Sequence, residues 1–140
     1  MTLGLTDIVD AQDRQALGLW LDVTSHAVRA AGPDLTARQT ALLLTVYLEV
    51  GPHTVRALAK RLGVGKPAIV RAIDSLGDAG LVTRVPDPVD RRNVFIEGTA
   101  QGAAQLCDYA RNIARNITQI THHINAQNDT LIGEGQRRFA

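Results

Sequence analysis

The segment between residues 35 and 102 constrains the fold most, because three short helical patterns there are followed by two strand patterns. The first helical pattern begins at Thr36, and Gln39 three residues later completes a capping box. Gly51-Pro52 is expected to end it. Its apolar residues recur at helical spacing and are expected to face inward, namely Leu42, Leu43, Val46, Tyr47 and Val50. Thr54, a favourable N-cap residue, is expected to begin the second helix.

The third helical pattern begins at Lys66, with Pro67 in the first turn. Proline is tolerated there because the N–H that it lacks would have no acceptor within the helix. Its apolar residues repeat at spacings of four and three, which predicts a buried face made of Ile69, Ile73 and Leu76. The opposite face then presents Lys66, Val70, Arg71 and Asp74 to solvent. Gly80 is expected to mark the end of this helix.

Two strands are expected at residues 81–85 and 93–96, since both stretches are rich in β-branched or aromatic residues. The residues between them, 86–90, have the composition of a turn. The pair predicts a hairpin whose exposed tip carries Asp90, Arg91 and Arg92. Helices followed by such a hairpin indicate a mostly α, winged helix-turn-helix fold with a DNA-binding lobe at 35–98 and its wing at 81–97.

Two further helical segments flank this lobe, and we interpret the whole chain, residues 1–140, as a single domain. The first segment, residues 5–32, starts at Thr6-Asp7 and ends at Gly32-Pro33. The second segment, 99–132, carries an apolar stripe with heptad spacing from Ala103 through Ala110 to Ile124, and Gly133 and Gly135 mark a frayed tail after it. We expect both segments to form a homodimer interface that includes Leu17, Trp20, Leu106, Ile113, Ile117, Ile120 and Ile124.

Positive charge is concentrated in the lobe, although the formal net charge of the chain is only +1. Residues 53–92 carry eight lysines and arginines against four aspartates, a net charge of +4, whereas the remainder carries seven cations against ten carboxylates, a net charge of −3. Such segregation favours a surface that binds nucleic-acid phosphates. The alternative is a solvated basic face with no partner.

The third helix and the hairpin tip are the expected DNA contacts. Arg71 can form paired hydrogen bonds with a guanine edge, and Lys66 lies at a helix N-terminus suited to a phosphate. At the tip, Asp90 can hold one arginine while the other enters a minor groove, and the sequence leaves open which does which. The alternatives are ordinary surface charges, with Arg71 paired to Asp74, and a purely structural turn. The expected contacts are Thr54, Arg56, Lys66, Pro67, Val70, Arg71, Arg84, Asp90, Arg91 and Arg92.

These residues together resemble the MarR-type transcriptional regulators over about half of the chain. The matching positions are Leu35-Thr36 with Gln39, Thr54-Val55 with Leu58-Ala59, the 66–76 helix, Gly80-Leu81-Val82 with Arg84, Asp90 with Arg92, and Thr99 with Gly102. The resemblance implies a homodimer in which the 66–76 helix reads the major groove, Asp90 orders the wing and Arg92 contacts the minor groove. Two positions depart from the family: Gly65 replaces a capping Ser, and Gly98 replaces a Leu, which predicts a looser or bent junction after the wing.

Several single residues have alternative interpretations. By the same resemblance, Trp20, His26, Tyr47 and Tyr109 are candidates for binding a small-molecule effector, although a core or interface role is favoured for Trp20 and Tyr47. Cys107 is the only cysteine, and Asp108 beside it would raise a thiol pKa, so an interface or core thiol is favoured over a redox sensor. Adjacent His122 and His123 point in different directions on a helix, so we expect no metal and no cofactor.

The sequence therefore predicts a sequence-specific DNA-binding regulator rather than an enzyme, because no catalytic motif is found. It lacks an apolar run of the ~20 residues that cross a bilayer and a signal peptide, which favours the cytoplasm. We expect repression through a pseudo-palindromic duplex site, with release by a small molecule as a further possibility. The alternative is a protein-interaction module on a winged-helix scaffold that no longer binds DNA; the retained Arg71 and tip arginines favour DNA.

Overall fold

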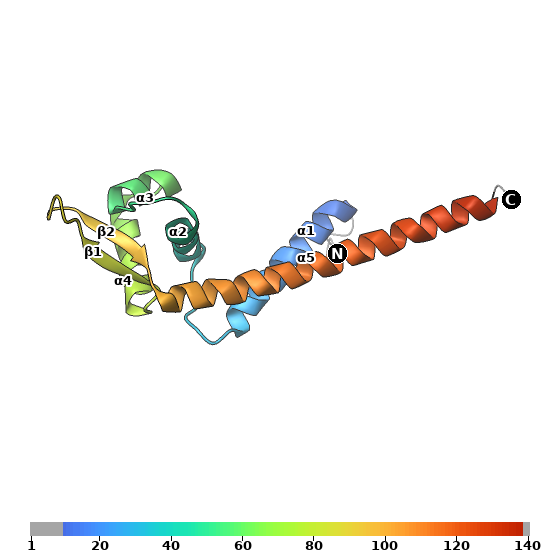
Figure 1. Ribbon diagram of the computed structural model, residues 1–140, viewed down its shortest axis with the longest axis horizontal. Helices are drawn as coiled ribbons and strands as arrows, with labels where there is room; N and C mark the ends of the chain where they lie inside the picture. Colours follow the sequence, from blue (N-terminus) through green and yellow to red (C-terminus); the bar gives the residue numbers. More distant parts are fainter. Residues whose placement is uncertain (1–9, 139–140) are drawn as a thin grey trace, which may run out of the picture. The chain divides into compact units, whose positions relative to one another are not determined.

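The computed structural model describes residues 10–138, with the backbone alone for residues 127, 128 and 131–138. Its elements in chain order are α1 (Ala11–Arg29), α2 (Ala37–Leu48), α3 (Val55–Leu62), α4 (Lys66–Asp78), β1 (Val82–Pro86), β2 (Val94–Gly98) and α5 (Ala100–Arg138) (Figure 1). The chain divides into a central unit, residues 31–107, and a terminal unit formed by the chain on either side of it. This is the mostly α, winged helix-turn-helix architecture that the sequence predicts.

Helix α2 begins as its capping box predicts. The Thr36 hydroxyl accepts the Gln39 N–H at 3.2 Å, and the Gln39 side chain accepts the Thr36 N–H at 2.8 Å. The predicted inward position of Val50 is wrong, because that side chain is 99% exposed. The helix ends at Leu48, and Glu49 adopts an extended backbone (φ −100°, ψ 153°). Val50 therefore no longer follows the helical phase that buries Leu42, Leu43 and Val46.

The two following helices also begin at the expected residues. The Thr54 hydroxyl accepts the Ala57 N–H at 3.1 Å at the start of α3, and Gly63 ends that helix in the left-handed region at φ 65°. At α4 the N-cap is Gly65, which supplies no side-chain hydrogen bond, and Pro67 lies in the first turn. The first-turn N–H groups of α4 are therefore not capped by a side chain.

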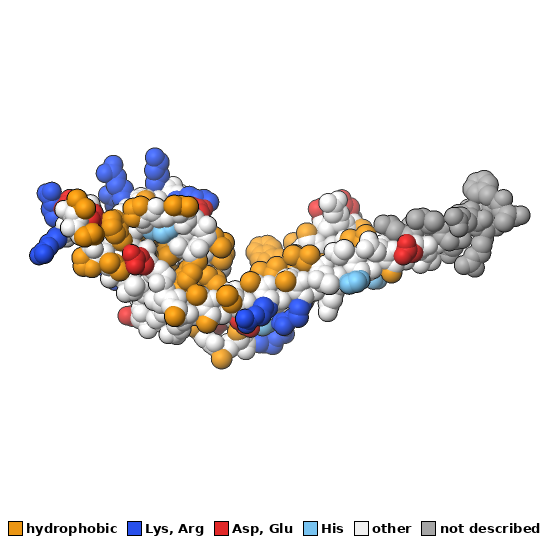
Figure 2. All heavy atoms as spheres, viewed as in Figure 1, with side chains coloured by type: hydrophobic (Ala, Val, Ile, Leu, Met, Phe, Trp, Pro, Cys, Tyr) orange, Lys and Arg blue, Asp and Glu red, His pale blue; other side chains and the backbone are white. Residues whose placement is uncertain are grey.

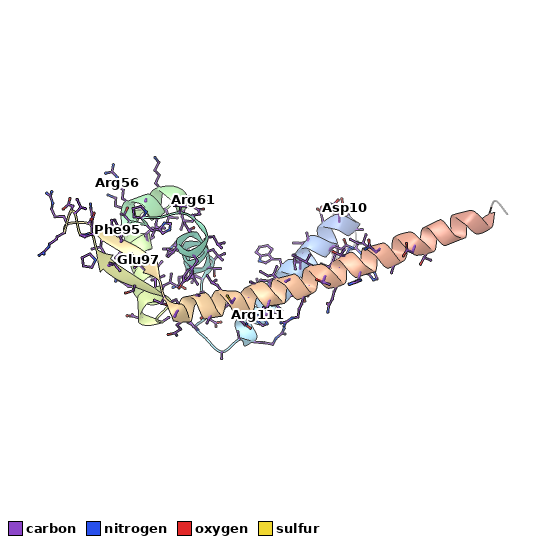
Figure 3. The ribbon with its side chains drawn as sticks, viewed as in Figure 1. Asp10, Arg56, Arg61, Phe95, Glu97 and Arg111 are labelled. Carbon is purple, nitrogen blue, oxygen red and sulfur yellow. The ribbon has the colours of Figure 1, made fainter. Side chains whose placement is uncertain are left out.

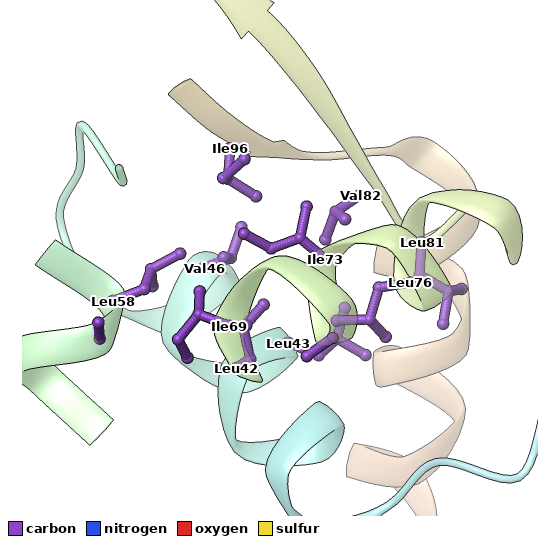
Figure 4. Packing of buried hydrophobic residues seen from close by; sticks show 12 residues of the cluster. Leu42, Leu43, Val46, Leu58, Ile69, Ile73, Leu76, Leu81, Val82 and Ile96 are labelled. Atoms are coloured by element: carbon purple, nitrogen blue, oxygen red, sulfur yellow. The ribbon is translucent and has the colours of Figure 1, made fainter. Parts of the chain in front are cut away.

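The core of the central unit lies where α2, α3 and α4 meet the base of the hairpin (Figure 4). Ile69, Ile73 and Leu76 of α4 are fully buried, as their spacing predicts. The other members are Leu42, Leu43, Val46, Leu58, Ala59, Ala72, Leu81, Val82 and Ile96. Because α4 buries one face so completely, its opposite face is held outward in a fixed orientation.

The hairpin is the wing of the fold, and it extends beyond the helices of the central unit (Figure 1). Strands β1 and β2 pair antiparallel, with Arg84 opposite Ile96. The bounds of the strands differ slightly from the sequence prediction. Strand β1 ends at Pro86, and strand β2 continues to Gly98. Ile96 also donates its N–H to the His53 carbonyl at 2.8 Å, so the segment before α3 adds a short bridge to the sheet.

Tyr47 fills the junction between the wing and α5. A Cβ atom at Gly98 would lie 2.6 Å from the ring atoms Cε1 and Cζ of Tyr47, which is closer than atoms can approach. A Cβ atom at Gly102 would overlap the Tyr47 hydroxyl and the Leu81 carbonyl. The junction at Gly98 was predicted to be looser or bent; the looser alternative is wrong, because the aromatic ring occupies the space that a side chain there would need.

The terminal unit consists of α1 and the later part of α5. The expected start at Thr6-Asp7 lies outside the described residues; the described helix begins after Asp10, whose carboxylate accepts the Asp13 N–H at 2.9 Å. No residue of α1 is buried. The predicted fraying at Gly133 and Gly135 is wrong, because α5 continues through both to Arg138. A glycine costs a helix about 1 kcal/mol without necessarily ending it.

A polar cluster joins α1 to α5 in the terminal unit. His26 Nε2 lies 2.8 Å from Asp108 Oδ2, and the rings of His26 and Tyr109 pack edge to face with centroids 6.1 Å apart. Within residues 10–138, no helix has the length and apolar character that a membrane crossing requires.

Candidate nucleic-acid interface

The exposed face of α4 carries the side chains that the sequence assigns to base reading. Lys66, Val70 and Arg71 are all exposed, on the side opposite the buried isoleucines. Neither Lys66 nor Arg71 forms an ion pair within the described part of the chain. Asp74 pairs with Arg84 of β1 instead of Arg71. The α4 cations are thus held on a rigid helix and remain available to an anionic partner.

Helix α3 adds a second set of exposed cations. Arg56 and Lys60 are one turn apart, exposed and without an ion pair among the described side chains, and Figure 3 shows Arg56 standing out from the helix. The Thr54 hydroxyl is already occupied by its capping bond to Ala57. Sequence reasoning omitted Lys60, although its spacing of four from Arg56 on a predicted helix was a usable signal.

Two other arginines of the central unit are engaged by carboxylates. Arg61 Nε lies 2.9 Å from Glu49 Oε1, and the pair joins α3 to the end of α2. The Arg61 hydrogen bond lowers the pKa of Glu49, and the same contact raises the pKa of Arg61. The Arg84 guanidinium binds Asp74, which joins β1 to α4. These pairs fix elements relative to one another; Arg84 was predicted as a DNA contact, and here a carboxylate holds it.

Asp87 organises the turn at the wing tip, a role that sequence reasoning missed. Its side chain is only 9% exposed, and its carboxylate accepts the Val89 N–H at 2.8 Å and the Asn93 amide at 3.5 Å. The Val89 bond, together with the Asp90 N–H and the Asn93 side chain, lowers the pKa of Asp87 against the opposing effect of burial. Asp87 lies in the predicted turn, but its burial depends on how that turn folds.

Asp90 determines how the two tip arginines differ. Its Oδ1 atom accepts both the backbone N–H and the Nε–H of Arg92, each at 3.1 Å. The Arg92 side chain nevertheless remains 91% exposed, so its terminal nitrogens face solvent. Arg91 forms no ion pair with any residue that the structure describes. The carboxylate thus holds Arg92 rather than Arg91, and which of the two enters a minor groove stays a prediction.

The wing tip should loosen in acid because of Asp87. Its pKa in the folded chain lies below that of an unfolded aspartate, so its stabilisation is complete above that ordinary value and is lost as the pH falls below about 4. We expect the Val89 amide resonance to shift with this transition in an NMR titration. In Asp87→Asn, the Val89 amide resonance should already lie at neutral pH where the wild type places it in acid. An identical titration of this resonance in both proteins would contradict the role of Asp87.

Apart from Arg38 of α2, the unpaired cations of the central unit lie on three neighbouring elements, namely α3, α4 and the wing. Figure 2 shows Lys and Arg side chains over α3 and the wing tip. The members without an ion pair among the described residues are Arg56, Lys60, Lys66, Arg71 and Arg91. We call this set the basic surface. A helix face with cations on it, flanked by a protruding basic hairpin, has the form of a double-helix reader.

The remaining predicted sites are brought together only in part. Of the ligand candidates, His26 and Tyr109 are in contact, Trp20 is 66% exposed on α1, and Tyr47 belongs to the central unit. Leu106, a predicted dimer residue, packs against the central core. Cys107 is exposed, so of the expected interface and core positions the core is wrong, and an interface position stays a prediction. No cluster of three His, Cys, Asp or Glu side chains is suitable for a metal among the described residues.

Comparison with known proteins agrees with this geometry. The model of the MarR family matches residues 34–93. An HTH-type transcriptional regulator of Mycobacterium leprae is 43% identical over 107 residues, which is 74% of each chain. A transcriptional regulator of Thermotoga maritima has a similar fold, with a TM-score of 0.67 and 24% identity over 91% of this chain and 93% of that one. CouR of Rhodococcus jostii, solved with p-coumaroyl-CoA, is 25% identical over 93% of each chain, with a TM-score of 0.57.

Proposed function

The chain belongs to the MarR family of DNA-binding transcriptional regulators, and from this premise we propose that it is a homodimeric repressor of a pseudo-palindromic operator. Helix α4 reads the major groove through Arg71, with Val70 against the bases, and Lys66 binds a phosphate at its N-terminus. Thr54, Arg56 and Lys60 face the sugar–phosphate backbone from α3. Arg91 and Arg92 extend from the wing into the minor groove.

The basic surface is the observation that supports this proposal most. Its five cations have no carboxylate partner in the described chain, whereas Arg61 and Arg84 are neutralised by Glu49 and Asp74. Unpaired cations on one surface release counterions from DNA when they bind phosphates, and this drives association. A module that binds only proteins has no need of such a surface, so the alternative of a lost DNA function is disfavoured.

The exposed apolar residues of the terminal unit support the homodimer. Leu17, Trp20, Leu21 and Val28 of α1 are exposed, as are Ile117 and Ile124 of α5. Ile113 and Ile120 of the same stripe on α5 are half-buried. An apolar stripe of this extent is characteristic of protein interfaces, and a second copy would cover it with an equivalent stripe. Two copies also match the symmetry of a palindromic site.

Release by a small molecule is the remaining part of the proposal. CouR binds p-coumaroyl-CoA in its crystal structure, which gives a precedent for an aromatic acyl-CoA effector. In this chain His26 and Tyr109 form an aromatic and polar pair beside Asp108. Trp20 and Tyr47 complete the candidate set. Thermal shift with a panel of aromatic acids and their CoA esters tests this part.

Arg71→Ala is expected to remove sequence discrimination. The missing bidentate contact should cost about 1–3 kcal/mol on the preferred site and much less on random duplex. The preferred site is first selected from a random duplex pool, and fluorescence anisotropy then measures both affinities. Arg111→Ala, which removes an exposed arginine of α5, is the matched control. An unchanged ratio of the two affinities in Arg71→Ala would show that α4 is not the reader.

A further inference from the structure

We infer that Tyr47 is a positioning residue for the wing, an inference that rests on the proposed DNA-binding function. Tyr47 lies on α2, and its hydroxyl bonds to Leu81 and Thr99, neither of which is an expected DNA contact. Its hydroxyl nevertheless reaches both ends of the hairpin at once. Through those contacts it sets the direction in which the tip arginines point.

The hydroxyl of Tyr47 bonds to three backbone groups. It shares its proton between the carbonyl oxygens of Leu81, at 2.7 Å, and Thr99, at 2.9 Å, and it accepts the Thr99 N–H at 2.7 Å. Leu81 immediately precedes β1, and Thr99 immediately follows β2. One oxygen atom on α2 therefore fixes the entry and the exit of the wing.

Thr99 extends this junction to α5 and to the end of α4. Its hydroxyl donates to the Gly80 carbonyl at 2.6 Å and accepts the Gly102 N–H at 3.0 Å, which caps α5. Gly98 and Gly102 leave the space in which the Tyr47 ring and hydroxyl lie. The residues are complementary: a tyrosine at 47 requires the two glycines, and the glycines leave a void without the tyrosine.

The wing amplifies any change at its base. Each strand has five residues, and at about 3.3 Å of rise per residue the tip lies roughly 17 Å beyond the junction. Small rotations of the base thus displace Arg91 and Arg92 by ångströms. Besides Tyr47, the Arg84–Asp74 pair holds β1 to α4, but that pair is exposed and so restrains the wing less. The part-buried Tyr47 hydroxyl, with three hydrogen bonds, is a stronger restraint on the base than this exposed pair.

The test is Tyr47→Phe, which removes the hydroxyl and keeps the ring beside Gly98. We expect its affinity for a random-sequence duplex to fall roughly fivefold to tenfold, with a smaller salt dependence. In an Arg91→Ala/Arg92→Ala background, Tyr47→Phe should leave the duplex affinity almost unchanged, because the tip arginines no longer contribute to binding. Equal losses in both backgrounds, or no loss in either, would overturn the inference.

Thr45→Val is the matched control, since it removes a buried hydroxyl from the same helix whose bond stays within α2, to the Ala41 carbonyl. It should leave affinity unchanged in both backgrounds. A second measurement does not need DNA: Tyr47→Phe should speed hydrogen exchange in residues 82–99 while leaving α3 and α4 protected. If the wild-type chain binds no duplex, the proposed function fails; unchanged exchange in the wing would separately refute the role of Tyr47.

Discussion

An Ile117→Asp chain is expected to be monomeric and to lose operator binding although every residue of the basic surface remains. Ile117 is 49% exposed in a single chain and lies on the apolar stripe of α5. A carboxylate placed in the proposed dimer interface would be buried without a partner, at a cost of about 3–5 kcal/mol. Light scattering and anisotropy on the selected duplex measure the two losses.

Gln119→Asp separates the effect of position from the effect of charge. It adds the same carboxylate two residues later, on the opposite side of the helix, where the side chain is exposed. It should therefore remain dimeric and bind DNA like the wild type. A wild-type chain that is already a folded monomer at micromolar concentration would contradict the proposed interface, as would an Ile117→Asp chain that still binds as a dimer.

The elements of the central unit were predictable because their signals are local. The capping box at Thr36, the cap at Thr54 and the spacing of Ile69, Ile73 and Leu76 each involve residues within about one or two turns of each other. Such signals determine where a helix begins and which face it buries. They therefore also place Arg71 on the outer face of α4 without any knowledge of the fold.

The parts that sequence reasoning missed depend on residues brought together by the fold. Asp74 is three residues from Arg71, yet it binds Arg84 on another element. The burial of Asp87 follows from the closed turn of the wing, which composition does not reveal. Helix ends are similarly difficult, because Val50 continues the apolar pattern of α2 although the backbone has already left the helix.

Tyr47 and Gly98 are the strongest example, since 51 positions separate them and neither is unusual alone. The departure from the family at Gly98 was visible in the sequence, but its cause was not. A glycine in place of a leucine suggested a weakened junction. The fold shows instead that the Tyr47 ring of α2 occupies the space beside Gly98, and its hydroxyl reaches the wing base.

Gly98→Leu should therefore destabilise this chain even though it restores the residue common in the family. The new side chain would collide with the Tyr47 ring, and overpacking of this kind costs about 3 kcal/mol or more. Tyr47→Leu alone should also destabilise, because it leaves a void and unbonded groups at Leu81 and Thr99. The double variant should recover more than half of the Gly98→Leu loss, since Tyr47→Leu removes the steric conflict and the new leucine at 98 fills part of the void. Urea unfolding of the four proteins measures the coupling; strictly additive losses would show that the ring and the glycine are not a complementary pair.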